Sequence, residues 1–277
     1  MLLSCLLYPV GPAAIILMPM IVGGLIDSHG FSEQQAGNIA ALEGLGLVFA
    51  SMLAAAWIRR VSWVKALLVA FLGYAALNIL SANIEAYVPL LVLRCLSGLA
   101  GGSVMAVTVA ALGDQREPDR AFGLAQAVQG VMMLGGFLAA PWLVQRWGVS
   151  AIYYMLAGAS LLMMLMLPRF PVAGRVRAAA TRENALQAGH TGLIWLGLFA
   201  SVLFFVNVFG FWAFVERIGQ AGGLPAQTIA LALGISQVVA IAGALAAAWA
   251  SDRYGRYLPL LMLVIGQAAA LFAGRGA

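Results

Sequence analysis

Residues 36–58 read AGNIAALEGLGLVFASMLAAAWI, an apolar run of 23 residues in which Glu43 is the single charged residue. An α-helix of this length reaches about 34 Å at about 1.5 Å per residue. The hydrocarbon core of a bilayer is about 30 Å thick. The stretch therefore predicts a helix that crosses a membrane, and Arg59 and Arg60 mark its polar end.

The same pattern continues along the chain. Of the 277 residues, 63% are hydrophobic and 9% are charged, whereas a soluble domain has about 25% charged residues. A soluble protein needs a polar shell, and this composition cannot supply one. Gly, Pro and charged residues divide the chain into nine apolar stretches, near 5–27, 36–58, 64–83, 87–112, 121–144, 149–168, 192–216, 227–250 and 257–273. We therefore expect an all-α, polytopic transmembrane helical bundle.

A polar segment separates the first six stretches from the last three. Residues 169–190 contain four arginines and few large apolar side chains, which is typical of a solvated linker. This break predicts a six-helix N-terminal bundle in residues 1–168, a linker in 169–190, and an incomplete three-helix C-terminal bundle in 191–277.

Positive charges predict the orientation of the chain. Eleven of the fifteen Lys and Arg residues fall in loops on one side of the predicted spans, three fall on the other side, and Arg94 lies within a span. Cytoplasmic loops carry the excess of positive charge. We expect the linker and the N-terminus to be cytoplasmic, in the inner (plasma) membrane.

A short repeat indicates an internal duplication. Leu53-Ala-Ala-Ala-Trp57 recurs unchanged as Leu245-Ala-Ala-Ala-Trp249, at an offset of 192 residues. Both copies end a predicted span that enters an arginine-bearing loop. Chance identity in alanine-rich helices is the alternative. Parallel repeats of this kind occur in secondary transporters.

The loop after the second copy points to a family. Its sequence, Ser251-Asp252-Arg253-Tyr254-Gly255-Arg256, resembles the D-R-x-G-R signature loop of the major facilitator superfamily, and residues 94–102, RCLSGLAGG, resemble the R-x-L-x-G-x-x-G-G pattern of that family. The resemblance implies a secondary active transporter that works by alternating access. It also implies that Asp252, Arg253, Gly255 and Arg256 form a cytoplasmic gating loop. A local pairing of Asp252 with Arg253 or Arg256 is the alternative.

The length of the chain departs from that family, whose members usually have twelve spans. At the offset of 192 residues, the counterpart of the span near 87–112 would begin just beyond the last residue. We therefore expect a truncated product. The alternative to transport is a transport-inactive gene product, or a membrane assembly or sensory partner.

Two ionisable residues lie well inside predicted spans. Glu43 lies about eight residues inside the second span and Arg94 about seven inside the fourth, so their depths match. Intramembrane charges are costly and are functional hypotheses by default. We expect this pair to contact substrate or to couple transport to protons. A static pair that fixes helix packing and a Glu43 side chain that reaches outward to headgroups are the alternatives.

Uncharged polar residues complete the candidate site. Tyr8, Gln126, Gln129 and Asn207 lie in spans that line the cavity in the resembling family, and each could hydrogen-bond a solute. Hydrogen bonds between helices are the alternative. Gly98 and Gly102 are interpreted as packing residues, because a small-x-x-x-small spacing lets helices approach closely.

The sequence lacks the motifs of several other function classes. The sequence contains no phosphate-binding loop and no H-E-x-x-H zinc motif, and its two histidines fall in loops on opposite sides. We expect no enzyme activity, no metal, no cofactor and no nucleic acid partner. The expected partners are a small-molecule solute, protons as a coupling ion, and membrane lipid. Substrate identity, transport direction and oligomeric state do not follow from the sequence.

Overall fold

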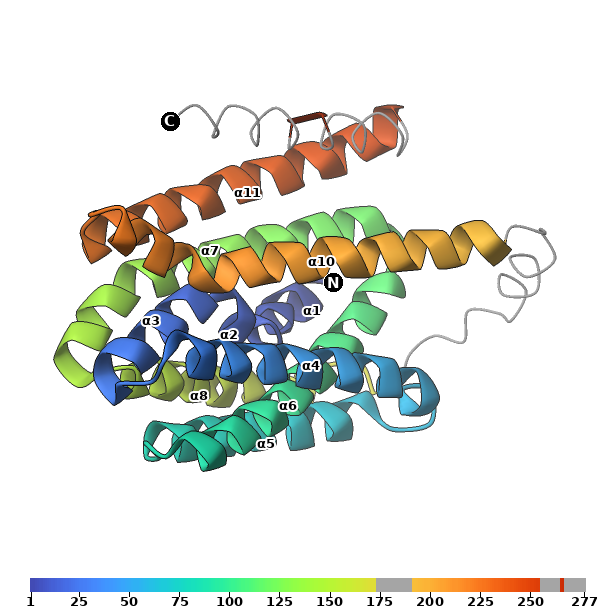
Figure 1. Ribbon diagram of the computed structural model, residues 1–277. Coiled ribbons are helices and arrows are strands. Elements are labelled where there is room, and N and C mark those ends of the chain that lie inside the picture. The colour runs from blue at the N-terminus through green and yellow to red at the C-terminus, as the bar shows by residue number, and fades with distance from the viewer. Residues whose placement is uncertain (173–190, 255–264, 267–277) are drawn as a thin grey trace.

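The computed structural model describes residues 1–172, 191–254 and 265–266, and every regular element in these ranges is helical. Figure 1 shows the elements, which run α1 (Leu2–Leu7), η1 (Tyr8–Val10), α2 (Ala13–Ile16), α3 (Met18–His29), α4 (Glu33–Trp57), α5 (Trp63–Ala82), α6 (Tyr87–Gly113), α7 (Pro118–Trp147), α8 (Ser150–Met164), η2 (Leu167–Arg169), α10 (Thr191–Ala221) and α11 (Ala226–Tyr254). The expected span at 257–273 lies almost wholly outside the described residues.

The first expected span is broken into short helices. Pro9 and Pro12 lie where α1, η1 and α2 meet, and Pro19 lies in the first turn of α3. Proline has no N–H to donate and its ring clashes with the preceding turn, so each one interrupts a continuous helix. The segment nevertheless stays buried from Ser4 to Leu25 at most positions, against α6 and α7.

Local sequence sets several helix ends. The hydroxyl of Ser32 accepts a hydrogen bond from the backbone N–H of Gln35, and the Gln35 side chain accepts one from the backbone N–H of Ser32. This reciprocal capping box starts α4. Gly30 (φ +67°) and Gly148 (φ +70°) end α3 and α7 in conformations that favour glycine.

The surface of the bundle is apolar. Phe49, Met52 and Val69 are each more than 60% exposed on α4 and α5. Within the described residues, five helical segments are long and apolar enough to cross a membrane: α4, α5, α6, α7 and residues 226–246 of α11. Lipid is the solvent that such a surface requires.

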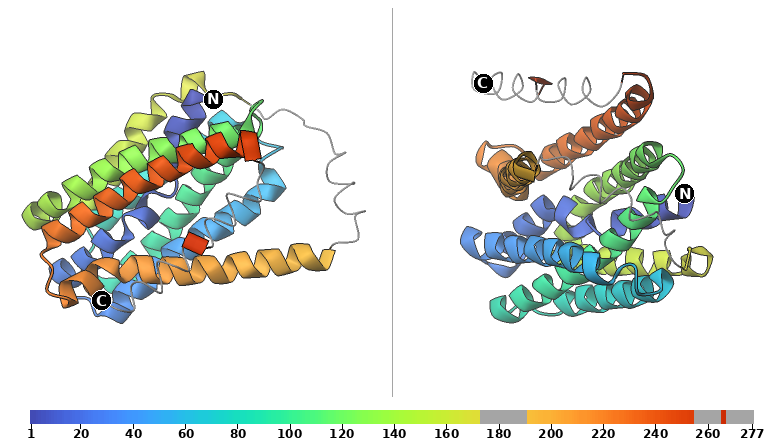
Figure 2. Two further views of the ribbon diagram at one scale, coloured as in Figure 1. Left: turned by 90° about the horizontal axis from the view of Figure 1, so that it is seen from above. Right: turned by 90° about the vertical axis from the view of Figure 1, so that its right-hand side faces the viewer.

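Helices α1–α8 form one packed bundle, and α10 and α11 form a second group beside it, each packed more extensively on that bundle than on the other. Within α1–α8, α4 packs most extensively on α6, and α5 packs on both α6 and α8. Figures 1 and 2 show α10 and α11 on one side of this bundle, where α10 lies along α3 and α11 lies along α7.

Candidate functional site

The structure brings Glu43 and Arg94 together. Arg94 Nη1 lies 3.1 Å from Glu43 Oε1, and both side chains are almost completely buried, with 0% and 2% of their surface exposed. Glu43 comes from α4 and Arg94 from α6, the two helices that pack most closely. Because Glu43 is buried inside the bundle, the alternative in which it reaches outward to the headgroups is wrong.

Arg94 is also held by two further helices. Its Nη2 donates to Asn78 Oδ1 at 3.2 Å and to Ser81 Oγ at 2.9 Å, and its Nε donates to Ser81 Oγ at 3.1 Å. The guanidinium also lies 4.5 Å from the ring centre of Tyr153 on α8. Four helices therefore meet at one arginine, which satisfies most of its donors.

Sequence reasoning missed Asn78, Ser81 and Tyr153. A signal for the first two was present, because residues three apart on a helix share a face and this polar pair interrupts an apolar span. For Tyr153 the sequence offered no comparable pattern. Its assignment needs the position of α8 against α6.

Among the described residues, Glu43 has fewer hydrogen-bond partners than Arg94. Oε1 accepts from Arg94, while Oε2 accepts no hydrogen bond from the described residues, although the Ser97 side chain lies beside the carboxylate. The two residues of the ion pair therefore differ in how many other partners hold them. Loss of the contact would leave Arg94 with several partners and would leave Glu43 without a cation.

Glycines allow the close approach that forms this pair. A Cβ atom on Gly98 would overlap the carbonyl oxygen of Glu43, and one on Gly102 would overlap the carbonyl oxygen of Leu47. From the opposite helix, a Cβ on Gly46 would overlap the carbonyl of Cys95. We call these three glycines the α4–α6 seam. The packing interpretation of Gly98 and Gly102 is confirmed.

The other predicted polar residues lie apart from this pair. Tyr8 is buried in a small cluster with Cys5, Leu112, Ala121 and Ala125. Gln126 is exposed, and Gln129 is half-buried with its side-chain oxygen lacking a partner among the described residues. Asn207 falls within α10, in a stretch whose side chains the structure does not describe. The structure does not join these residues into one site, and their contact with solute stays a prediction.

The predicted gating loop is only partly covered. Asp252 and Arg253 lie in the last turn of α11, where side chains are not described, and Gly255 and Arg256 lie outside the described residues. Its gating role therefore stays a prediction.

A second polar cluster joins α3 to α10. Arg217 Nη1 lies 2.8 Å from Asp27 Oδ1 and 2.8 Å from Gln220 Oε1, and Gln220 Nε2 donates to Glu216 Oε1 at 3.3 Å. The span expected at 192–216 ends just before Arg217, so the sequence predicts a loop at Arg217, and it does not distinguish Glu216. Acidic and basic neighbours at the end of an apolar run look like a helix boundary, but α10 continues to Ala221.

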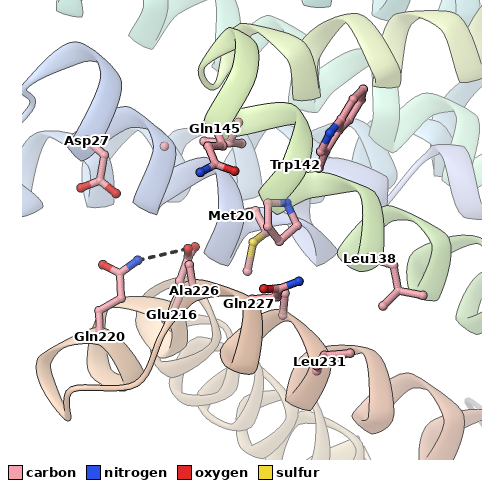
Figure 3. Close-up of a pocket in the computed structure, with 14 residues that line it drawn as sticks. Met20, Asp27, Leu138, Trp142, Gln145, Glu216, Gln220, Ala226, Gln227 and Leu231 are labelled. Carbon is pink, nitrogen blue, oxygen red and sulfur yellow. Dashed lines mark hydrogen bonds between the residues drawn. The ribbon is translucent and has the colours of Figure 1, made fainter.

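A pocket of about 460 Å³ opens beside this cluster. Its walls come from α3, from the C-terminal parts of α7 and α10, and from the start of α11. Figure 3 shows Glu216 and Gln227 on one wall and Gln145 and Met20 on the other. The pocket thus lies between the first eight helices and the last two described.

Comparison with known families fits this arrangement. The model of the Major Facilitator Superfamily matches residues 7–274. The chain belongs to this family. As a member of the Major Facilitator Superfamily it is a multi-pass membrane transporter, and the family is not one of enzymes. No curated protein sequence matches the chain at a significant level.

Solved structures of the superfamily share the fold. A crystal structure titled D-xylose-proton symporter matches with a TM-score of 0.72 at 15% identity, over 91% of this chain and 68% of that one. A second, titled as the proton:xylose symporter XylE bound to 6-bromo-6-deoxy-D-glucose, matches with a TM-score of 0.67 at 14% identity, over 92% of this chain and 70% of that one. At these identities the likeness shows the fold alone, and it confirms the helical bundle of the major facilitator type expected from the sequence.

Proposed function

We propose that this member of the Major Facilitator Superfamily is a secondary active transporter that moves a small solute by alternating access and couples that movement to protons through Glu43 and Arg94. The buried ion pair is the observation that carries the proposal. We also propose that the chain lies in the inner (plasma) membrane with a cytoplasmic N-terminus, since the positive charges of its loops favour that orientation.

The difference in the number of partners of Glu43 and Arg94 suggests how proton coupling would work. In an apolar interior an unpaired charge costs several kcal/mol, so a buried carboxylate that loses its cationic partner tends to take up a proton. Among the described residues, Glu43 has one cationic partner, whereas Arg94 has other partners on α5 and α8. A movement that draws the Arg94 side chain away from Glu43, toward its partners on α5 and α8, would therefore load Glu43 with a proton, and its reversal would release that proton.

The proposal can be tested without knowing the solute. Spin labels at Ser28 on α3 and Ala221 on α10, both exposed, would report the distance between the two groups of helices at one end. The background would carry serine at Cys5 and Cys95. We expect the distance distribution in lipid nanodiscs to shift between about pH 5 and about pH 8, because protonation of Glu43 favours one conformation.

Two variants separate coupling from a general effect of pH. Glu43→Gln should remove the pH-dependent shift, whereas Glu85→Gln, at an exposed carboxylate between α5 and α6, should retain it. A pH shift that persists in Glu43→Gln would refute the coupling role. A single, unchanging distance in every condition would favour the transport-inactive alternative.

Solute flux is the direct test of transport. D-xylose is the first probe, because both similar structures are titled as xylose–proton symporters. Uptake into proteoliposomes that depends on an imposed pH gradient, and that is lost in Glu43→Gln, would support proton-coupled transport of a sugar. Uptake that does not depend on the pH gradient would contradict proton coupling.

A further inference from the structure

Glu216 lines this pocket, and one of its carboxylate oxygens is buried without a hydrogen-bond partner among the described residues. Glu216 is 7% exposed and lines the pocket, and its Oε2 accepts no hydrogen bond from any described residue. Its Oε1 accepts from Gln220. An unsatisfied acceptor at this depth is costly unless a donor occupies the space beside it.

The charges around Glu216 do not compensate it. The neighbouring Arg217 is engaged with Asp27 at 2.8 Å and with Gln220 at 2.8 Å. Among the described residues, the lining of the pocket includes two acidic side chains and no basic one. With Asp27 balanced by Arg217, Glu216 has no cationic side chain of its own among the described residues, so its carboxylate needs either a proton or a cation from outside the chain.

The shape and lining of the pocket define what could supply the missing charge. A volume of about 460 Å³ falls within the usual range for small-ligand sites of about 300–1,000 Å³. The amides of Gln145 and Gln227 offer two further acceptors, and Met20, Leu138 and Leu231 provide apolar surface. An ammonium group has three donors and no acceptor, so it matches one carboxylate oxygen and two amide oxygens.

We propose that this pocket binds a small primary ammonium ion with a compact apolar body, which pairs with the Glu216 carboxylate. A neutral polyol could donate hydrogen bonds to the same carboxylate but would leave its charge uncompensated. An anion would be repelled by it. The site is separate from the Glu43–Arg94 pair, and its occupancy does not depend on the proton coupling proposed above.

Matched probes of one size distinguish these ligands. Cyclohexylamine, cyclohexanol and cyclohexanecarboxylate differ in charge while sharing a ring, and D-xylose represents a polyol. Binding to the purified full chain in lipid nanodiscs would be measured by isothermal titration calorimetry near pH 7, where the amine is protonated. We expect saturable binding of cyclohexylamine, at least about tenfold tighter than that of cyclohexanol, and no competition by the carboxylate or by D-xylose.

Variants of Glu216 test the assigned contact. Glu216→Gln should weaken cyclohexylamine binding by roughly thirtyfold or more, because it removes the charge that the ammonium pairs with. Glu216→Asp keeps the charge and should keep the preference for the amine over the alcohol, which guards against a variant that fails to fold. Glu33→Gln, at an exposed carboxylate on α4, should bind like the parent chain.

Three results would overturn the proposal. They are equal binding of the amine and the alcohol, amine binding that is unchanged in Glu216→Gln, and displacement of the amine by D-xylose. The first would mean that Glu216 holds a proton instead of a cation. The third would make the pocket a polyol site. None of these results bears on the pH-dependent movement tested with Glu43→Gln, so the two proposals fail separately.

Discussion

Replacing Arg94 with methionine should destabilise the protein far more than replacing Glu43 with glutamine. Methionine keeps the apolar stem but removes every donor, so Glu43 loses its cation and the side-chain oxygens of Asn78 and Ser81 lose their partner. Removing one member of a buried pair costs about 3–5 kcal/mol. In Glu43→Gln the new amide can still accept from Arg94, and we expect a loss of about 1–2 kcal/mol.

The double variant gives the sharper test. Glu43→Gln together with Arg94→Met leaves no unpaired charge at the site, so it should be at least as stable as Arg94→Met alone. The two substitutions would then fall short of additivity by about 1–3 kcal/mol, as expected for residues in direct contact. Free energies of unfolding would come from reversible SDS titration in mixed micelles, followed by far-UV circular dichroism.

An exposed ion pair with a similar N–O distance provides the control. Arg120 Nη1 lies 3.2 Å from Glu117 Oε2, and both side chains are about two-thirds exposed. Arg120→Met and Glu117→Gln should each change stability by less than about 1 kcal/mol, since exposed pairs contribute little. If the buried double variant loses the sum of its single losses to within about 0.5 kcal/mol, the two side chains do not interact energetically and the reasoning is refuted.

Three further predictions concern packing and contacts between the halves. Gly98→Ala should cost about 1–3 kcal/mol in the same titration, because its methyl group overlaps a carbonyl of α4, whereas Gly158→Ala on α8, with nothing within 4 Å, should be neutral or stabilising by up to about 1 kcal/mol. Trp212→Phe should cost about 1 kcal/mol, since the indole N–H donates to the carbonyl of Ile16 at 2.9 Å; equal stability would show that this carbonyl has another partner. Arg217→Gln should cost less than about 1 kcal/mol because its ion pair with α3 is partly exposed, and a loss as large as that of Arg94→Met would contradict the role of burial.

Much of the helical fold could be predicted from hydropathy and from the Gly, Pro and charged residues that separate the apolar stretches. The sequence predicts spans near 64–83 and 87–112, and the structure has α5 at Trp63–Ala82 and α6 at Tyr87–Gly113. This agreement has a physical cause, since a segment that crosses lipid must satisfy its backbone internally and therefore forms one uninterrupted helix. The first span departs from the pattern because its prolines remove backbone donors within a segment buried among other helices.

The sequence predicted the two charged residues of the ion pair but not the neutral residues around them. Glu43 and Arg94 stand out because ionised groups are rare inside apolar spans. Asn78 and Ser81 give a weaker signal, since they share a helix face but are neutral and small, so their cost in an apolar helix is low. Glu216 could not be predicted for a different reason. It adjoins Arg217 at the edge of an apolar run, and only the packing of α10 against α3 shows that it is buried.

The α4–α6 seam determines which parts of the bundle can move when the charge pair changes. Its glycines leave no space for even a methyl group between the two helices, so rotation or sliding of α4 against α6 would drive backbone into backbone. We therefore expect these two helices to move together, with the backbones at Glu43 and Arg94 fixed relative to each other. The side chain of Arg94 reaches across to Ser81 on α5 and to Tyr153 on α8, and α5 packs on α6 as extensively as on α8. A proton on Glu43 would therefore change how strongly Arg94 holds α5 and α8 against α4 and α6, through the position of one side chain.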